Sequence, residues 1–214
     1  MNLFTFFAHH AGEIWRAIGE HVWLVGATIV LAIAIGVPLG VVVARKNWLS
    51  KPILGGANIA ETIPSLALFG FLLPVPWLGG RADRLAITAL TLYALLPIIR
   101  NTAAGIAAVN PAVRESARAM GMTERQILFE VEMPLALPTV LAGVRVATVL
   151  TIGVATIAAA VGAGGLGEFI FRGLAMVSDP LILAGAIPAA VLAIGADALL
   201  GLVERKLRPA GGNA

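Results

Sequence analysis

The sequence contains no cysteine among its 214 residues, so disulfides and thiolate metal sites are excluded. Charged residues are also scarce, at 13% of the chain, against roughly 25% in an ordinary soluble domain. Hydrophobic residues, by contrast, make up 59%. A soluble domain of this size would have to expose large apolar patches, whereas a lipid bilayer solvates such surface. The composition therefore predicts an integral membrane protein.

The few charged and histidine residues argue against a nucleic-acid-binding protein, a cleavable signal peptide and a metal site. The net charge of +3 comes from short basic clusters between apolar stretches, a pattern typical of membrane orientation and not of nucleic-acid binding. The first twenty residues lack a basic segment followed by an uninterrupted apolar one, so no cleavable signal peptide is expected. The three histidines, His9, His10 and His21, have no acidic cluster beside them. No metal site is expected there.

Five apolar stretches are long enough to cross a membrane, since a helical span needs about 20 mostly apolar residues. They predict an all-α integral membrane fold, with a kink at Pro64 in the second span. The spans are expected at residues 22–44, 57–78, 85–109, 135–161 and 181–203.

Before the first span, apolar residues recur among polar ones at roughly helical spacing. This pattern predicts an amphipathic helix over residues 1–21 that lies in the membrane interface, with a flexible terminus as the alternative. The apolar residues are Leu3, Phe4, Phe6, Phe7, Ile14, Trp15 and Ile18.

The orientation follows from the basic residues, which concentrate on the cytoplasmic side of a membrane protein. With five spans, one side receives ten of the fifteen Lys and Arg, and the other side receives four. The ten are Arg45, Lys46, Lys51, Arg100, Arg114, Arg118, Arg125, Arg205, Lys206 and Arg208. We therefore expect the N-terminus outside and a cytoplasmic tail over 206–214, with the transmembrane domain covering 22–205.

The segment 110–133, on the same cytoplasmic side, has the signals of two short helices. Asn110 followed by proline is a good helix start, and Gly121 is a natural end because glycine adopts the left-handed conformation freely. Thr123 can cap a second helix, since Gln126 three residues later completes a capping box. That helix is expected to end at Pro134.

The two helices present apolar side chains among many charges, which indicates a partner protein. These side chains are Val113, Ala117, Met120, Ile127, Leu128 and Val131. A DNA-binding helix-turn-helix has similar local features, but membrane spans flank this segment closely on both sides.

Specific residues of this segment resemble the EAA loop of ABC importer permeases. That pattern is Glu-Ala-Ala, three residues, Gly, nine residues, then Ile-x-Leu-Pro. The matching residues are Glu115, Ser116, Ala117, Gly121, Val131, Met133 and Pro134. The spacing fits in full, and the three departures preserve size or hydrophobicity. The resemblance implies that the loop forms the coupling helix, with Glu115, Ser116, Ala117, Gly121 and Pro134 in the ATPase-coupling role.

Four further phrases extend the resemblance over residues 22–205. Residues 62–68, 93–102, 162–167 and 183–188 are similar to permeases of osmoprotectant importers, which carry glycine betaine, carnitine or choline. A methionine-type amino-acid permease is the alternative, because it shares the five-span plan and the loop. A membrane scaffold or sensor that does not transport, and a passive channel, also remain open.

The resemblance also implies the assembly and the mechanism. Such a chain works with a second permease copy or paralogue, two ATPase subunits and a separate extracytoplasmic substrate-binding protein, in the inner membrane. ATP and magnesium belong to the ATPase, so this chain is expected to hold no cofactor and to be no enzyme. With one tyrosine and four tryptophans spread thinly, no aromatic cage for a quaternary ammonium is visible. Selectivity is therefore expected in the binding protein.

Three charged residues fall within or near the spans, where charges are costly and usually face a bundle interior or water. Glu61 or Asp197 is expected to pair with Arg145 and fix helix packing; a place in the translocation path and a position near the interface are the alternatives. The glycine-rich segment 162–167 lacks the Lys-Ser/Thr of a phosphate-binding loop. It is interpreted as flexible backbone beside the pore, or as a plain helix-ending loop.

Overall fold

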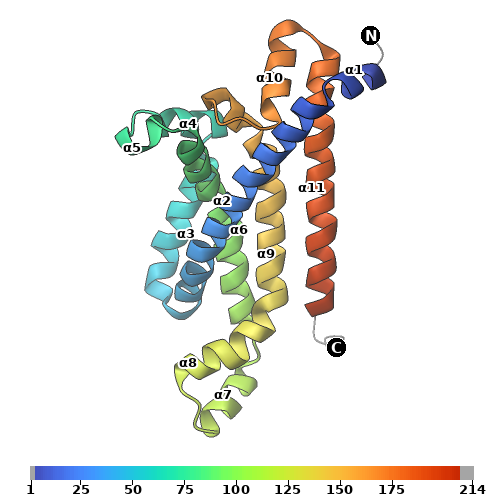
Figure 1. Cartoon of the computed structure of the whole chain (residues 1–214). Helices are drawn as coiled ribbons and strands as arrows, with labels where there is room; N and C mark the ends of the chain where they lie inside the picture. Colours follow the sequence, from blue (N-terminus) through green and yellow to red (C-terminus); the bar gives the residue numbers. More distant parts are fainter. Residues whose placement is uncertain (1–2, 208–214) are drawn as a thin grey trace.

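The computed structural model describes residues 3–207, which form helices joined by short connections, with no strand in that range (Figure 1). The all-α class is thus confirmed. The elements are α1 Leu3–His9, α2 Ala11–Arg45, α3 Asn47–Thr62, α4 Ser65–Leu72, α5 Pro76–Gly79, α6 Ala82–Ala107, α7 Pro111–Ala119, α8 Glu124–Gln126, the π-helix η1 Ile127–Glu132, α9 Met133–Ala155, the 3₁₀-helix η2 Ile157–Val161, α10 Gly167–Met176 and α11 Asp179–Leu207.

Four helices in the described residues are long and apolar enough to cross a membrane on their own. They are α2, α6, the continuous helix Glu124–Ala155 and α11. The pair α3 and α4 qualifies only when taken together, and it is bent by 103°. With this pair as one span, the five predicted crossings are present. The predicted tail over 206–214 lies mostly outside the described residues.

The structure places the first boundary differently from the prediction. No break separates an interfacial helix from the first span at residue 22, because α2 runs unbroken from Ala11 for 35 residues. Ile14 and Ala17 are buried in a cluster with Phe169 of α10 and Leu181 of α11. The helix that holds the first span therefore begins at Ala11, and its first turns pack against α10 and α11.

The second span also begins earlier than predicted, at Asn47 and not at residue 57. A single residue, Lys46, separates it from α2. The kink expected at Pro64 is confirmed, and it is a full break. Proline disfavours the helical conformation in the residue before it, and Ile63 is accordingly extended, with φ −70° and ψ 127°. The freed carbonyl of Ile63 accepts a hydrogen bond from the Tyr93 hydroxyl of α6.

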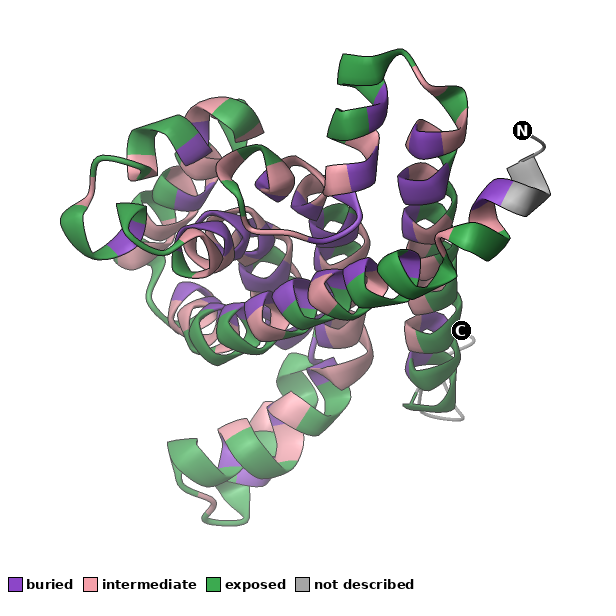
Figure 2. Ribbon diagram, turned by 45° about the horizontal axis from the view of Figure 1, so that its top comes forward, coloured by how far each residue is buried: buried purple, intermediate pink, exposed green. Residues whose placement is uncertain are grey.

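Helix α6 lies between α2 and α9, and small residues allow the three to approach closely. A Cβ added at Gly40 would stand 2.5 Å from Cβ of Thr102. One added at Gly143 would stand 2.5 Å from Cβ of Asn101 and 2.8 Å from the Pro97 carbonyl oxygen. Membrane helices associate through such contacts, because lipid provides no hydrophobic drive between them. Buried residues accordingly concentrate on the faces where these helices meet (Figure 2).

The connections lie at two ends of the bundle. The C-terminal ends of α2 and α11 lie at the same end as α7 and α8, which project beyond the bundle, while α4, α5 and α10 lie at the opposite end (Figure 1). The elements that the charge count assigned to one side therefore share one end of the molecule.

Candidate functional site

The first helix of the projecting loop is built from local signals, as predicted. The side chain of Asn110 accepts a hydrogen bond of 2.9 Å from the amide of Ala112, and Pro111 occupies the first turn of α7. At the other end, Gly121 has φ +83°. The amide of Gly121 donates to the Arg118 carbonyl and that of Met122 to Ala117, over 2.9 and 3.1 Å. These two bonds are a Schellman motif, which satisfies the last carbonyls of α7.

The second helix begins at the predicted capping box. The amide of Gln126 donates to the Thr123 hydroxyl, and the Gln126 side chain accepts from the Thr123 amide over 2.9 Å. Two amides that lack helical acceptors are thereby paired reciprocally. The sequence prediction of both caps is confirmed.

The predicted end of this helix at Pro134 is wrong. The helix continues through η1 into α9, so that Glu124–Ala155 is one rod of 32 residues. In η1 the backbone widens to a π register, and Met133 donates to the carbonyl of Leu128. Pro134 then falls in the first turn of α9, where a missing amide interrupts least. The second helix of the loop is therefore continuous with the fourth span.

The five residues expected to have the ATPase-coupling role divide into one buried residue and four exposed ones. Ala117 is only 2% exposed and packs inside the loop. Glu115, Ser116, Gly121 and Pro134 are exposed. Large apolar side chains are exposed beside them, among them Met120 at 75% and Phe129 at 67%. The loop thus presents a mixed polar and apolar surface away from the bundle.

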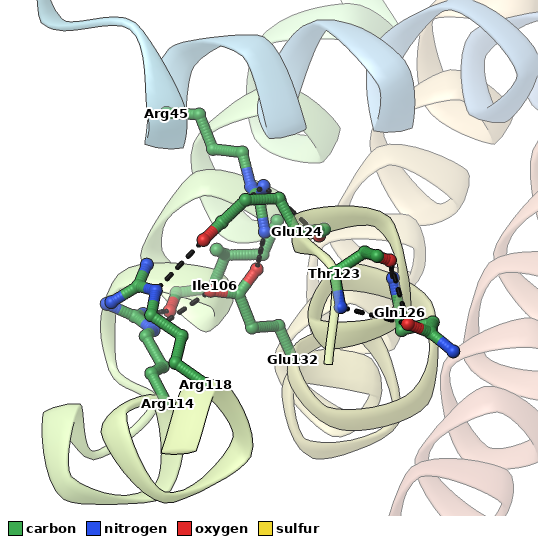
Figure 3. Close-up of polar contacts among 8 residues, drawn as sticks. All are labelled: Arg45, Ile106, Arg114, Arg118, Thr123, Glu124, Gln126 and Glu132. Carbon is green, nitrogen blue, oxygen red and sulfur yellow. Dashed lines mark hydrogen bonds and ion pairs between the residues drawn. The ribbon is translucent and has the colours of Figure 1, made fainter. Parts of the chain in front are cut away.

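A network of charges that the sequence did not reveal links this loop to the first span (Figure 3). The carboxylate of Glu132, in η1, is buried and accepts from Nη2 of Arg45 at 2.6 Å and pairs with Nε of Arg114 at 2.9 Å. Arg114 also donates to the Ile106 carbonyl of α6. Arg45 is the last residue of α2, and Arg114 belongs to α7. One carboxylate therefore joins three elements.

A second carboxylate extends the network. Glu124 contacts Nε of Arg118 at 2.9 Å and Nη1 of Arg45 at 3.4 Å. The hydrogen bond that Arg118 donates to Glu124 raises the pKa of the Arg118 guanidinium above its ordinary value. A polar cleft of about 420 Å³ lies among these side chains, with Ala44, Ile106 and Ala107 completing its wall. Arg114 and Arg118, four residues apart on one helix face, were the only local sign of this arrangement.

Of the three charged residues expected within or near the spans, the structure brings two together. Arg145 of α9 pairs with Asp197 of α11, and its Nη1 lies 3.5 Å from Glu204, one turn before the end of the described chain. Glu61, the other carboxylate considered, does not join them; it is exposed near the end of α3. Gly201 stands between the two acids of α11, where an added Cβ would lie 3.1 Å from Arg145 Nη1.

The glycine-rich segment 162–167 joins helix ends at the opposite end of the bundle. Gly162, Gly164 and Gly165 have φ between 79° and 83°, a conformation that L side chains rarely adopt. The amide of Gly165 donates to the Glu20 carboxylate over 3.0 Å. His21, which follows Glu20 in the sequence, is fully buried, and its Nε2 lies 3.1 Å from the Ile152 carbonyl oxygen. The sequence did not predict these contacts of Glu20 and His21, since their partners are more than 130 positions away.

Comparison with known proteins assigns the chain to a family. Residues 36–209 match the family model of the binding-protein-dependent transport system inner membrane component, and the chain belongs to this family. It is thus a multi-pass inner-membrane permease component, as the EAA-type loop implied.

Individual relatives are similar over almost the whole chain. The osmoprotectant import permease protein OsmW of Salmonella typhimurium is 43% identical, over 99% of both chains. The carnitine transport permease protein OpuCD of Listeria monocytogenes is 48% identical, over 92% of this chain and 86% of its own. The choline transport system permease protein OpuBD of Bacillus subtilis is 43% identical, over 97% and 91%.

Solved structures agree on the fold. An inward-facing structure of the MetNI methionine ABC transporter matches with a TM-score of 0.83, covering 91% of this chain and 95% of that one. A bacterial alginate ABC transporter matches with a TM-score of 0.74. Their sequence identities are 22% and 17%, so these likenesses establish the permease fold alone.

Proposed function

We propose that this chain is the permease subunit of an ATP-driven importer for osmoprotectants of the glycine betaine, choline and carnitine type. The observation that supports the substrate class is the 40–48% identity to relatives named for these compounds, over nearly the full chain. The methionine alternative rests on a likeness of 22% identity, which carries no substrate information.

The proposed mechanism is alternating access. A partner ATPase docks on the loop 110–133, where Glu115, Ser116 and Gly121 are exposed, and Pro134 is exposed directly after it. ATP binding moves the docked loops, the spans open outward to a loaded binding protein, and hydrolysis restores the inward-facing state. Because the second loop helix continues into α9 as one rod, a displacement of the loop reaches the fourth span directly. ATP and magnesium are held by the ATPase, and the chain itself performs no chemistry.

The proposed orientation follows from the distribution of basic residues, and the proposed assembly follows from the family resemblance and the number of crossings. We place the loop end in the cytoplasm, because it holds most of the basic residues, and the segment 162–167 on the outside with the N-terminus. Two permease chains, identical or paralogous, two ATPase subunits and one separate binding protein complete the complex. The five crossings of one chain are too few to enclose a gated path.

The test is uptake of radiolabelled glycine betaine into proteoliposomes that contain the permease, its ATPase and the binding protein. We expect ATP-dependent uptake and substrate-stimulated ATP hydrolysis. Glu115→Lys should reduce co-purification of the ATPase, whereas Glu130→Lys, at an exposed glutamate of the same loop outside the motif, should not. Uptake without ATP would identify a channel, and hydrolysis indifferent to substrate would identify a scaffold or sensor. Uptake of methionine in place of glycine betaine would overturn the substrate assignment.

A further inference from the structure

We infer that Arg45 is a positioning residue that ties the first span to the coupling loop, with Glu132 as its essential partner. This inference rests on the proposed function, since it concerns how the motion of the docked loop reaches the spans. Two of the spans, α9 and α6, are already joined to the loop directly along the chain. α9 is continuous with the second loop helix, and α6 leads into α7 within four residues. The first span, α2, ends at Arg45 and has no direct connection to the loop, because α3 to α6 lie between them in the sequence.

The contacts of Arg45 supply that connection. Its two terminal nitrogens reach two different carboxylates: Nη2 lies 2.6 Å from Glu132 and Nη1 lies 3.4 Å from Glu124. Figure 3 shows the side chain extending from the end of α2 into the loop between these acids. A guanidinium can serve two acceptors at fixed angles, which a lysine ammonium on a flexible stem cannot do equally well.

Glu132 is suited to carry this contact because it is held on both sides. Its side chain is 6% exposed, and Arg114 of α7 pairs with its other oxygen at 2.9 Å. A buried carboxylate strongly disfavours losing a charged partner, because its charge is then left without compensation. The end of α2, α7 and η1 are therefore expected to move as one body when the ATPase displaces the loop.

The basic residue next in sequence shows that position alone does not explain the arrangement. Lys46 is also at the α2–α3 connection and is exposed, and the structure gives it no ion pair with a carboxylate of the described residues. Arg45 and Lys46 are thus a matched pair of adjacent cations at the same end of the bundle, and among the described residues only Arg45 forms ion pairs with the loop.

The experiment compares Arg45→Gln, Glu132→Gln, the double variant and the control Lys46→Gln in the reconstituted complex. The quantity measured is the amount of glycine betaine imported per ATP hydrolysed. For Arg45→Gln we expect a fall of at least ~5-fold, the lower end of ordinary coupling between sites, with hydrolysis falling much less than uptake. The double variant should be no worse than Glu132→Gln, because both changes remove one contact. Arg45→Lys should recover part of the ratio, and Lys46→Gln should leave it unchanged.

A second measurement separates coupling from folding. The chain has no cysteine, so spin labels can be attached before assembly at Lys46→Cys and Arg125→Cys alone. With Arg45 present, the distance between the labels should stay constant between the nucleotide-free and ATP-bound complexes; with Arg45→Gln it should change. An unchanged ratio of uptake to hydrolysis in Arg45→Gln, or a label distance that does not depend on Arg45, would each overturn the inference. A wild-type complex without ATP-dependent uptake would instead overturn the proposed function.

Discussion

Arg145 and Asp197 join α9 to α11 through two parallel contacts, Nε to Oδ1 at 2.6 Å and Nη2 to Oδ2 at 2.7 Å. This fork-to-fork geometry fixes the rotation of one helix relative to the other as well as their distance, which a single ionic contact does not. In a bundle that lacks a hydrophobic drive between helices, such a pair is a strong determinant of packing.

We predict that Arg145→Gln and Asp197→Asn each lower the thermal midpoint of the detergent-solubilised protein by several degrees. The double variant should lose less than the sum of the two, because each single change already removes the same contact. Thermal unfolding followed by circular dichroism or dye binding measures this. Strictly additive losses would show that the two residues act independently.

The close crossing of α6 and α9 gives a second prediction. Gly143→Ala places a methyl group 2.8 Å from the backbone oxygen of Pro97, which cannot move aside, so the protein should lose yield and thermal stability. Gly153→Ala is the matched control on the same helix, since an added Cβ there meets nothing within 4 Å. Equal behaviour of the two variants in size-exclusion and thermal assays would contradict the packing argument.

The turn between α7 and α8 gives a third prediction. Gly121 has φ +83°, so Gly121→Val should strain the Schellman motif and weaken ATPase co-purification severalfold. Gly121→Asn should retain more binding than the valine variant, because asparagine tolerates the left-handed conformation. If asparagine and valine were equally damaging, the side chain and not the backbone angle would be at fault, and a direct clash with the ATPase would be the explanation.

A fourth prediction concerns the opposite end of the bundle. Glu20→Ala removes the acceptor of the Gly165 amide and should increase hydrogen exchange in the segment 162–167. Glu20→Gln keeps an acceptor oxygen and should leave most of the protection in place. Exchange measured by mass spectrometry on peptides from this segment decides the matter, with peptides of α6 as the internal reference. Unchanged exchange in the alanine variant would show that Glu20 does not hold the segment.

The loop was the part of the molecule best predicted from sequence. Asn110, Gly121 and Thr123 act on amides and carbonyls within five residues of themselves, so their effects can be read locally. The predicted helix end at Pro134 was wrong for a reason that is also local. A proline was expected to end a helix, but a π turn before it shifts the register and places it where a helix accepts proline.

The sequence by itself determined the membrane class, the five crossings, the caps and turn of the loop, and the family, because composition, local hydrogen bonding and motif spacing are all properties of the chain read in order. Tertiary structure decided the rest. It extended α2 back to Ala11 through packing against α10 and α11, chose Asp197 and not Glu61 for Arg145, and brought Glu132 to Arg45 across 87 positions. These pairings depend on which helix faces meet, and no local rule specifies that.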